Sequence, residues 1–320
     1  MMSPNKIKEE LDTVISGQDE AKKLASFYGW LHQIRVARHM INVKDPILMR
    51  PVTFLLLGPT GCGKTYLIQS LSRLLGLPFM EINTINLSTP GWHGANFNDY
   101  YDAMAKNNTA MSENQLTHSI VLFDEIDKIA VTSGEGSSTS QTQHHLRLQY
   151  SLLKILEGAE SLGDNFGEGR GKTPDKIHTG NFMFVFAGSF EKLRDDRAKR
   201  NNSIGFHNAK ELETEPVDLQ TELINSGIIP ELAGRISGCA ELQPLTDTDL
   251  RNILTKTKGN IVDTYNKFLK DSNIHIKPED VDIQDIIETC KKKKTGARAL
   301  RQEYESRIID PLFKFFEGEL

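Results

Sequence analysis

One glycine-rich segment constrains the fold of this chain more than any other part of its sequence. Residues Gly58–Thr65 read GPTGCGKT, a complete match to the pattern G-x-x-x-x-G-K-[ST]. An apolar run at Thr53–Leu57 precedes the segment, and an amphipathic pattern predicts a helix from Lys64 to about Leu75. A strand, a glycine-rich turn and a helix in this order form a phosphate-binding loop, because the turn and the helix N-terminus direct backbone N–H groups at phosphate oxygens.

The side chains of this loop indicate a nucleoside triphosphate and Mg²⁺ as its ligands. Lys64 is expected to reach the β- and γ-phosphates, and the Thr65 hydroxyl is expected to bind Mg²⁺. Cys62 occupies a free position of the pattern, so we interpret it as an ordinary side chain rather than a redox switch. The predicted nucleotide contacts from the loop are Pro59, Thr60, Gly61, Cys62, Gly63, Lys64 and Thr65.

A pair of carboxylates supplies the second half of the predicted site. The apolar run Ile120–Phe123 ends in Asp124 and Glu125, which is the arrangement of a Walker B motif. Asp124 is expected to hold Mg²⁺, mainly through water. Glu125 is expected to orient and polarise the water that attacks the γ-phosphate, which is general-base chemistry.

Strand and helix patterns alternate up to about residue 245, which predicts an α/β fold. Strands that alternate with helices favour a parallel sheet sandwiched by helices. Residues 3–45 are expected to be helical, with a break at Ile15–Gln18. The expected strands are Thr53–Leu57, Phe79–Asn83, Ser119–Phe123, Phe182–Ala187 and Ala240–Gln243.

The pattern changes at Pro244–Asp247 and is almost wholly helical afterwards. We therefore predict a large α/β nucleotide-binding domain at residues 1–245 and a smaller, mainly helical lid domain at residues 246–320. The expected helices of the lid are 247–258, 259–270, 278–291 and 296–316. Thr132–Gln143 and Gly163–Gly180 are rich in small and polar residues, so they are expected to form loops that do not order themselves.

Charge, cysteine spacing and hydropathy argue against several classes of function. Lysine and arginine number 38 against 43 aspartates and glutamates, and a net charge of −5 argues against a broad nucleic-acid surface. The 3 cysteines lie far apart without a C-x-x-C pair, so neither a zinc ribbon nor a disulfide framework is expected. No apolar run reaches the length of a membrane span, and no signal-peptide pattern is found, so the expected location is the cytoplasm.

Several segments, in order along the chain, resemble the ClpX family of hexameric AAA+ protein unfoldases, which feed the ClpP peptidase. The matching segments are Ile15–Lys23, Gly58–Thr65, Phe123–Ile129, Leu152–Gly158, Gly227–Arg235 and Thr295–Arg301. The HslU family is similar but less close, because it carries a large inserted domain that is not seen here. The resemblance implies an AAA+ P-loop NTPase fold, ATP as the nucleotide, a homo-hexameric ring and protein substrates.

The resemblance also assigns roles to residues outside the phosphate loop. Ile15 and Gln18 match the segment that packs on the adenine and hydrogen-bonds to it. Arg235 matches the arginine finger, which reaches the γ-phosphate held by the neighbouring subunit and so makes hydrolysis depend on assembly. Arg298 matches the second sensor arginine on the lid, and Ser189 is the candidate for the first sensor. The predicted catalytic residues are therefore Glu125, Arg235 and Arg298.

Two further segments resemble the surfaces through which ClpX handles its partners. Gly91–Gly94 reads GWHG where ClpX has its aromatic pore loop, so Trp92 and His93 are expected to grip a translocating chain. A turn anchored by a buried Trp92 is the alternative. The second segment resembles the loop that docks on ClpP, although local packing of a small loop would also explain it. Its residues are Ile204, Gly205 and Phe206.

The predicted function is ATP-dependent protein unfolding and translocation, with delivery to a ClpP-type peptidase. The N-terminal zinc-binding domain of ClpX is not expected in this chain, and the basic loop at the ClpX pore entrance is not matched, so substrate choice does not carry over. A remodeller that disassembles a specific complex without proteolysis remains an alternative. An AAA+ nucleic-acid motor is another, against which the net charge and the pore aromatic argue.

Overall fold

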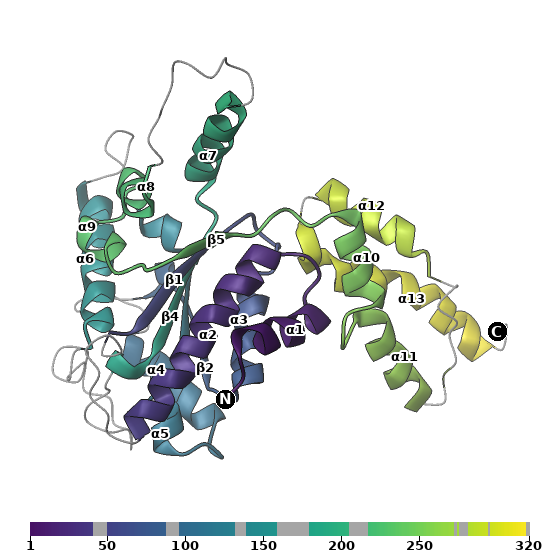
Figure 1. The fold of residues 1–320 in the computed structure, drawn as a ribbon. Coiled ribbons are helices and arrows are strands. Elements are labelled where there is room, and N and C mark those ends of the chain that lie inside the picture. Colours follow the sequence, from purple (N-terminus) through teal and green to yellow (C-terminus); the bar gives the residue numbers. More distant parts are fainter. Residues whose placement is uncertain are drawn as a thin grey trace.

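A parallel, 5-stranded sheet forms the centre of the larger part of the molecule (Figure 1). Its strands are β1 (Val52–Leu57), β2 (Phe79–Asn83), β3 (Ile120–Asp124), β4 (Met183–Gly188) and β5 (Cys239–Glu241). They follow the order β2-β3-β4-β1-β5. The computed structural model describes residues 1–40, 50–87, 96–131, 139–158, 179–204, 217–271, 274, 281–293 and 295–317. The predicted α/β fold with a parallel sheet is confirmed, and the strand positions differ by at most two residues at either end.

Helices cover both faces of this sheet, as predicted. One face carries α1 (Pro4–Val14), α2 (Asp19–Met40) and α3 (Lys64–Leu75). The other face carries the helices α4 (Phe97–Asn107), α6 (Thr139–Leu156), α7 (Glu191–Ile204), α8 (Leu219–Asn225) and α9 (Pro230–Ala233). The described residues of this part also form the short α5 (Glu113–Leu116) and the 3-10 turns Thr84–Asn86, Ile126–Ile129 and Thr179–Asn181.

The side chains of β1 point alternately to the two faces of the sheet, and both faces are buried. In β1 every residue is buried. Phe54 and Leu56 pack under α1–α3, whereas Leu55 and Leu57 pack under α4 and α6. Successive side chains of a strand point to opposite faces, so a run that is apolar throughout requires cover on both sides. The β1 sequence VTFLLL is apolar on both faces apart from the buried Thr53, so the sheet lies as a middle layer between helices.

The residues after Leu245 form a separate helical unit with a core of its own. It contains α10 (Asp247–Thr255), α11 (Ile261–Asp271), α12 (Ile283–Lys293), the 3-10 turn Gly296–Ala299 and α13 (Leu300–Glu317). The core of this unit includes Leu254, Ile286, Leu300 and Tyr304. Figure 1 shows the unit beside the sheet, on the side of α1. We call it the lid.

Helix α6 corrects one prediction. The segment Thr132–Gln143 was expected to be a loop throughout, but α6 begins at Thr139. Leu148, Leu152 and Ile155 anchor the helix in the sheet core, and a helix that is already nucleated adds polar residues at its N-terminal end at little cost. Most of the second expected loop, Gly163–Gly180, lies outside the described residues. Within the described part of the chain, no helix is both long and apolar enough to cross a membrane.

Candidate functional site

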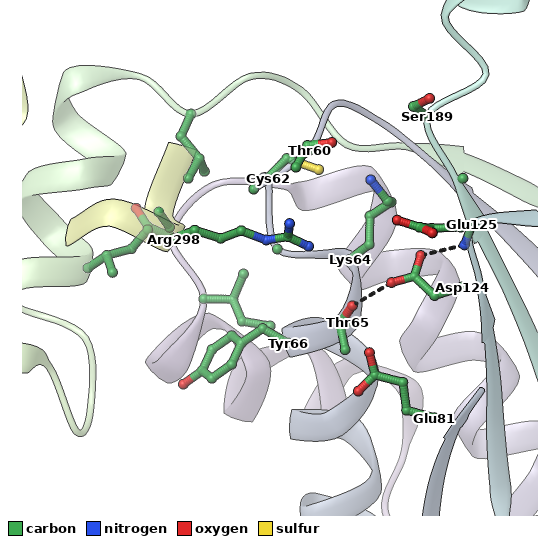
Figure 2. A pocket seen from close by; sticks show the side chains of 18 of the residues that line it. Thr60, Cys62, Lys64, Thr65, Tyr66, Glu81, Asp124, Glu125, Ser189 and Arg298 are labelled. Atoms are coloured by element: carbon green, nitrogen blue, oxygen red, sulfur yellow. Dashed lines mark hydrogen bonds between the residues drawn. The ribbon is translucent and has the colours of Figure 1, made fainter. Parts of the chain in front are cut away.

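The carboxyl ends of the parallel strands converge on one edge of the sheet and form the floor of a cavity. Because all the strands run in the same direction, the loop after β1, the end of β3 and the end of β4 meet there. The cavity has a volume of about 620 Å³, and its walls come from both the sheet edge and the lid (Figure 2). Predicted site residues that line it are Ile15, Thr60, Gly61, Cys62, Gly63, Lys64, Thr65, Asp124, Glu125, Ser189 and Arg298.

The phosphate loop starts directly at the end of β1 and ends at the first turn of α3. Gly63 caps α3 with a φ of 103°, a left-handed conformation that glycine adopts without strain. The Lys64 ammonium donates hydrogen bonds to the carbonyl oxygens of Gly58 (2.7 Å) and Pro59 (3.0 Å). Its charge therefore lies over the loop, beside the helix N-terminus, where an anion is favoured. Pro59 takes part through its carbonyl group and does not line the cavity.

The two carboxylates at the end of β3 face the loop in different ways. The Thr65 hydroxyl donates to Asp124 Oδ2 (3.2 Å), and the Glu125 backbone N–H donates to Asp124 Oδ1 (2.8 Å). Asp124 and Thr65 thus place a carboxylate and a hydroxyl side by side, as Figure 2 shows. Glu125 has a φ of 59°, a left-handed conformation that costs a residue with a side chain on the order of 1–2 kcal/mol.

Two residues at the end of β2 hold the strained turn in place. The Asn83 side-chain amide donates to Glu125 Oε2 (2.9 Å). The buried Thr84 hydroxyl lies within hydrogen-bond distance of the carbonyl oxygens of Asp124 (3.0 Å) and Glu125 (2.9 Å). Neither residue was predicted from the sequence. The available signal was register, because Asn83 ends a predicted strand and lies opposite Asp124 in the sheet.

A further carboxylate, Glu81 of β2, lines the same cavity. Burial against the cavity wall raises the pKa of Glu81, the nearby Asp124 carboxylate raises this pKa further, and Arg298 opposes both effects. The arginine, which comes from the lid, extends into the cavity toward the phosphate loop in Figure 2. The cavity therefore combines several carboxylates with the cations of Lys64 and Arg298, a charge pattern suited to a metal-bound polyphosphate.

The lid touches the phosphate loop directly through main chain. The Ala297 backbone N–H donates to the Gly61 carbonyl oxygen (3.1 Å). Gly61 and Gly296 both have positive φ values, and a Cβ at either position would collide with the backbone of the other segment. This close approach explains why glycine occupies both positions. It also brings Arg298, two residues after Gly296, to the cavity.

The connection between α1 and α2 forms another wall of the cavity and a second contact with the lid. Ile15 lines the cavity, as the adenine prediction requires. Gln18 does not line it, because its side-chain amide exchanges hydrogen bonds with the backbone N–H (2.9 Å) and carbonyl (2.8 Å) of Gln243. Ser16 donates to Asp249 Oδ1 of α10 (2.8 Å). The segment expected to contact the base therefore also bridges to the lid.

Of the remaining predicted residues, the structure describes Ser189 and Arg235. The Ser189 hydroxyl lines the cavity and donates to Asp127 Oδ2 (2.7 Å). Arg235 lies outside the cavity at the surface, where its guanidinium donates to Glu157 Oε1 (2.7 Å). The pore and docking predictions fall on residues that the structure does not describe: Trp92, His93, Gly205, Phe206 and the side chain of Ile204, whose backbone ends α7.

The donor set of the cavity fits magnesium rather than a softer metal. Hydroxyl and carboxylate oxygens, as in Thr65 and Asp124, are the ligands that Mg²⁺ takes in nucleotide sites, with water and phosphate oxygens completing its shell. Within the described residues, no group of three or more histidine, cysteine, aspartate or glutamate side chains could hold a metal ion by itself. Magnesium would thus be held jointly with phosphate oxygens.

Two parts of the chain match protein-family models. Residues 54–203 match the model described as ATPase family associated with various cellular activities (AAA). Residues 245–318 match the model described as the C-terminal, D2-small domain, of ClpB protein. The first match contains the phosphate loop and both carboxylates of β3, and the second contains Arg298. The two matches meet at the cavity.

Proposed function

Since residues 54–203 match an AAA ATPase family model and residues 245–318 match a ClpB-type small domain, we propose that this chain is a Clp/HSP100-type AAA+ protein that acts as an ATP-driven protein unfoldase and translocase. The ATPase domain indicates nucleotide binding and hydrolysis. The finer part of the proposal is that hydrolysis pulls a polypeptide through the axial pore of a ClpX-like homo-hexameric ring.

One observation carries this proposal: the cavity has walls from two units with separate cores. Lys64 and Asp124 belong to the unit built on the sheet, whereas Arg298 belongs to the lid. We divide the chain accordingly into residues 1–245 and 246–320. A ligand that contacts both units makes its binding energy depend on the angle between them, and loss of its γ-phosphate changes that angle. Such a change in angle is the mechanical step that translocation needs.

The described residues account for the chemical step. Lys64 contacts the β- and γ-phosphates after leaving the carbonyl oxygens of Gly58 and Pro59. Thr65 and Asp124 would hold Mg²⁺, which would supply positive charge between the phosphates. Glu125 accepts the proton of the attacking water, and Asn83 keeps the Glu125 carboxylate in one orientation.

The position of Arg235 supports an active site shared between subunits. Arg298 is the only arginine among the described residues that line the cavity, and Arg235 lies outside it at the surface. The ion pair of Arg235 with Glu157 is partly exposed, and pairs of this kind contribute little, so it is easily exchanged for a stronger partner. The neighbour's triphosphate provides such a partner.

Pore grip and peptidase docking are assigned by sequence resemblance alone. Trp92 and His93 would contact the translocating chain, and Ile204–Phe206 would dock on a ClpP-type peptidase in the cytoplasm. A remodeller that releases its substrate without proteolysis would share the ATPase and the pore. Deleting Ile204–Phe206 separates these functions, because degradation with an added ClpP-type partner should stop while remodelling continues.

The test is ATP-dependent unfolding of a stable fluorescent protein that carries a series of unstructured tails. The wild-type ring should unfold at least one tailed substrate, and Glu125→Gln should bind ATP and assemble without unfolding it. Trp92→Ala should hydrolyse ATP without unfolding. Unfolding that persists in either variant, or a wild-type ring that hydrolyses ATP and unfolds none of the substrates, would contradict the proposal.

A further inference from the structure

A fully buried glutamine lies in the middle of α6, on the face that packs against the sheet. Gln149 has no exposed surface. Its side-chain nitrogen donates to the carbonyl oxygens of Ile129 (2.8 Å) and Gly227 (3.0 Å), and its side-chain oxygen accepts from the Ile229 backbone N–H (2.7 Å). Both amide hydrogens and the carbonyl group of Gln149 are therefore engaged with main chain. Its neighbours on this face are apolar: Leu148, Leu152 and Ile155.

The segments that Gln149 joins also contact each other closely. The Val131 backbone N–H donates to the Gly227 carbonyl oxygen (2.8 Å). Gly227 has a φ of 94°, and a Cβ there would lie 2.6 Å from the Val131 nitrogen. One of these segments follows the β3 carboxylates through the turn Ile126–Ile129, and the other leads into α9. Gln149 thus braces the point where the two segments meet.

Arg235 lies just beyond the end of α9. Ile229, whose backbone N–H donates to the Gln149 side chain, is the N-cap residue of α9. The Arg235 backbone N–H donates to the Leu232 carbonyl oxygen (3.0 Å) within the same short turn. The Arg235 carbonyl accepts from the Thr53 hydroxyl of β1. Its guanidinium contacts Glu157, directly after the end of α6. The backbone that carries Arg235 is therefore fixed by α6 at one end and by β1 at the other.

We propose that Gln149 is a positioning residue for Arg235, and that its effect is felt at the neighbouring subunit's nucleotide. This inference rests on the proposed function of Arg235 as a finger in trans. A helix as short as α9 does not hold its own position, so its direction depends on what fixes its first residue. A guanidinium must reach the phosphate oxygens within hydrogen-bond distance, and a displacement of about 1 Å can cost roughly a hundredfold in rate.

The experiment mixes subunits that are inactive alone. In the reference mixture, Glu125→Gln subunits cannot hydrolyse ATP but still provide Arg235, and Arg235→Ala subunits have a complete site but no finger. Hydrolysis should return, because the Arg235→Ala sites receive the finger from their neighbours. Gln149→Met, which has a similar shape and no amide, is then added to one partner or the other.

We expect an asymmetric result. Gln149→Met in the Glu125→Gln subunit, which provides the finger, should lower the recovered rate by roughly 10–100-fold. The same substitution in the Arg235→Ala subunit should lower the recovered rate much less, because that subunit provides no arginine finger. A residue needed only for folding would lower the rate equally in both arrangements, and equal losses would overturn the proposal.

Two controls keep the result interpretable. Thermal unfolding identifies a variant that fails to fold, and Gln149→Glu then replaces Gln149→Met, because a protonated glutamate retains the acceptor and one donor. This variant should show the same asymmetry with a smaller loss, and equal losses would again overturn the proposal. No recovery in the reference mixture would instead refute the trans role of Arg235, and with it the basis of this inference.

Discussion

Replacing Gly296 by alanine should move the lid off the phosphate loop. The added Cβ would lie 2.6 Å from the Gly61 carbonyl oxygen and 2.9 Å from the Gly61 carbonyl carbon, distances that real Cβ atoms essentially never show. Both obstacles are backbone of a rigid loop, so the lid has to move. Movement breaks the hydrogen bond from Ala297 to Gly61 and withdraws Arg298 from the cavity.

The substitution has two separate costs: backbone strain, which lowers folding stability, and loss of the lid contact, which weakens nucleotide binding. A left-handed alanine costs about 1–2 kcal/mol relative to glycine, because φ at Gly296 is 59°. Loss of the hydrogen bond from Ala297 to Gly61 adds about 0.5–1.5 kcal/mol. Gly76 is the matched control, since its φ is 64° and nothing lies within 4 Å of its Cβ position. Gly76→Ala therefore introduces the same backbone strain without a steric collision, at a position far from the lid.

The assay is equilibrium binding of a fluorescent ATP analogue, with thermal unfolding measured in parallel. Gly296→Ala should raise the nucleotide Kd by roughly tenfold, because each tenfold in affinity corresponds to about 1.4 kcal/mol. Gly76→Ala should lower the unfolding temperature and leave the Kd near its wild-type value. If Gly296→Ala binds nucleotide as tightly as wild type, nucleotide binding does not need the contact between the lid and Gly61. That result would refute the proposed role of this contact.

Two further perturbations test the hydrogen bonds and the core. Asn83→Ala frees the Glu125 carboxylate, so we expect kcat for ATP hydrolysis to fall by roughly tenfold with little change in KM, and a rise in KM at constant kcat would contradict this role. Burial lowers the pKa of His32 to about 3. Since the neutral form is favoured in the folded chain, stability should be fully present above pH 6.5 and should fall below it, by up to about 1.4 kcal/mol per pH unit. Urea unfolding between pH 7 and pH 5 measures this slope. The substitution His32→Gln should reduce the slope, and a slope that the substitution leaves unchanged would contradict the role of buried His32.

Sequence patterns predicted the parts of the molecule that depend on local order. The buried strands, the phosphate loop and the Asp124–Glu125 pair each follow from a run of adjacent residues, and parallel strands then bring their ends together. The predicted break at Ile15–Gln18 also appears between α1 and α2. These features need no knowledge of distant contacts.

The missing parts depend on contacts between residues distant in sequence. No local pattern shows that Gly61 meets Gly296, or that Gln18 turns toward Gln243 instead of the cavity. Asn83 and Gln149 are single amides without a motif, and only their position among buried neighbours reveals a role. The available signal for Asn83 was its register opposite Asp124, and the signal for Gln149 was a polar residue on the apolar face of a helix.

The dependence of ATP turnover on chain concentration tests the central claim most directly. If hydrolysis requires Arg235 from a neighbouring subunit, turnover per chain should rise with concentration and follow the assembled fraction measured by light scattering. Arg235→Ala should assemble and stay inactive at every concentration. Turnover per chain that is constant down to the monomer, or that survives the loss of this guanidinium, would contradict the account.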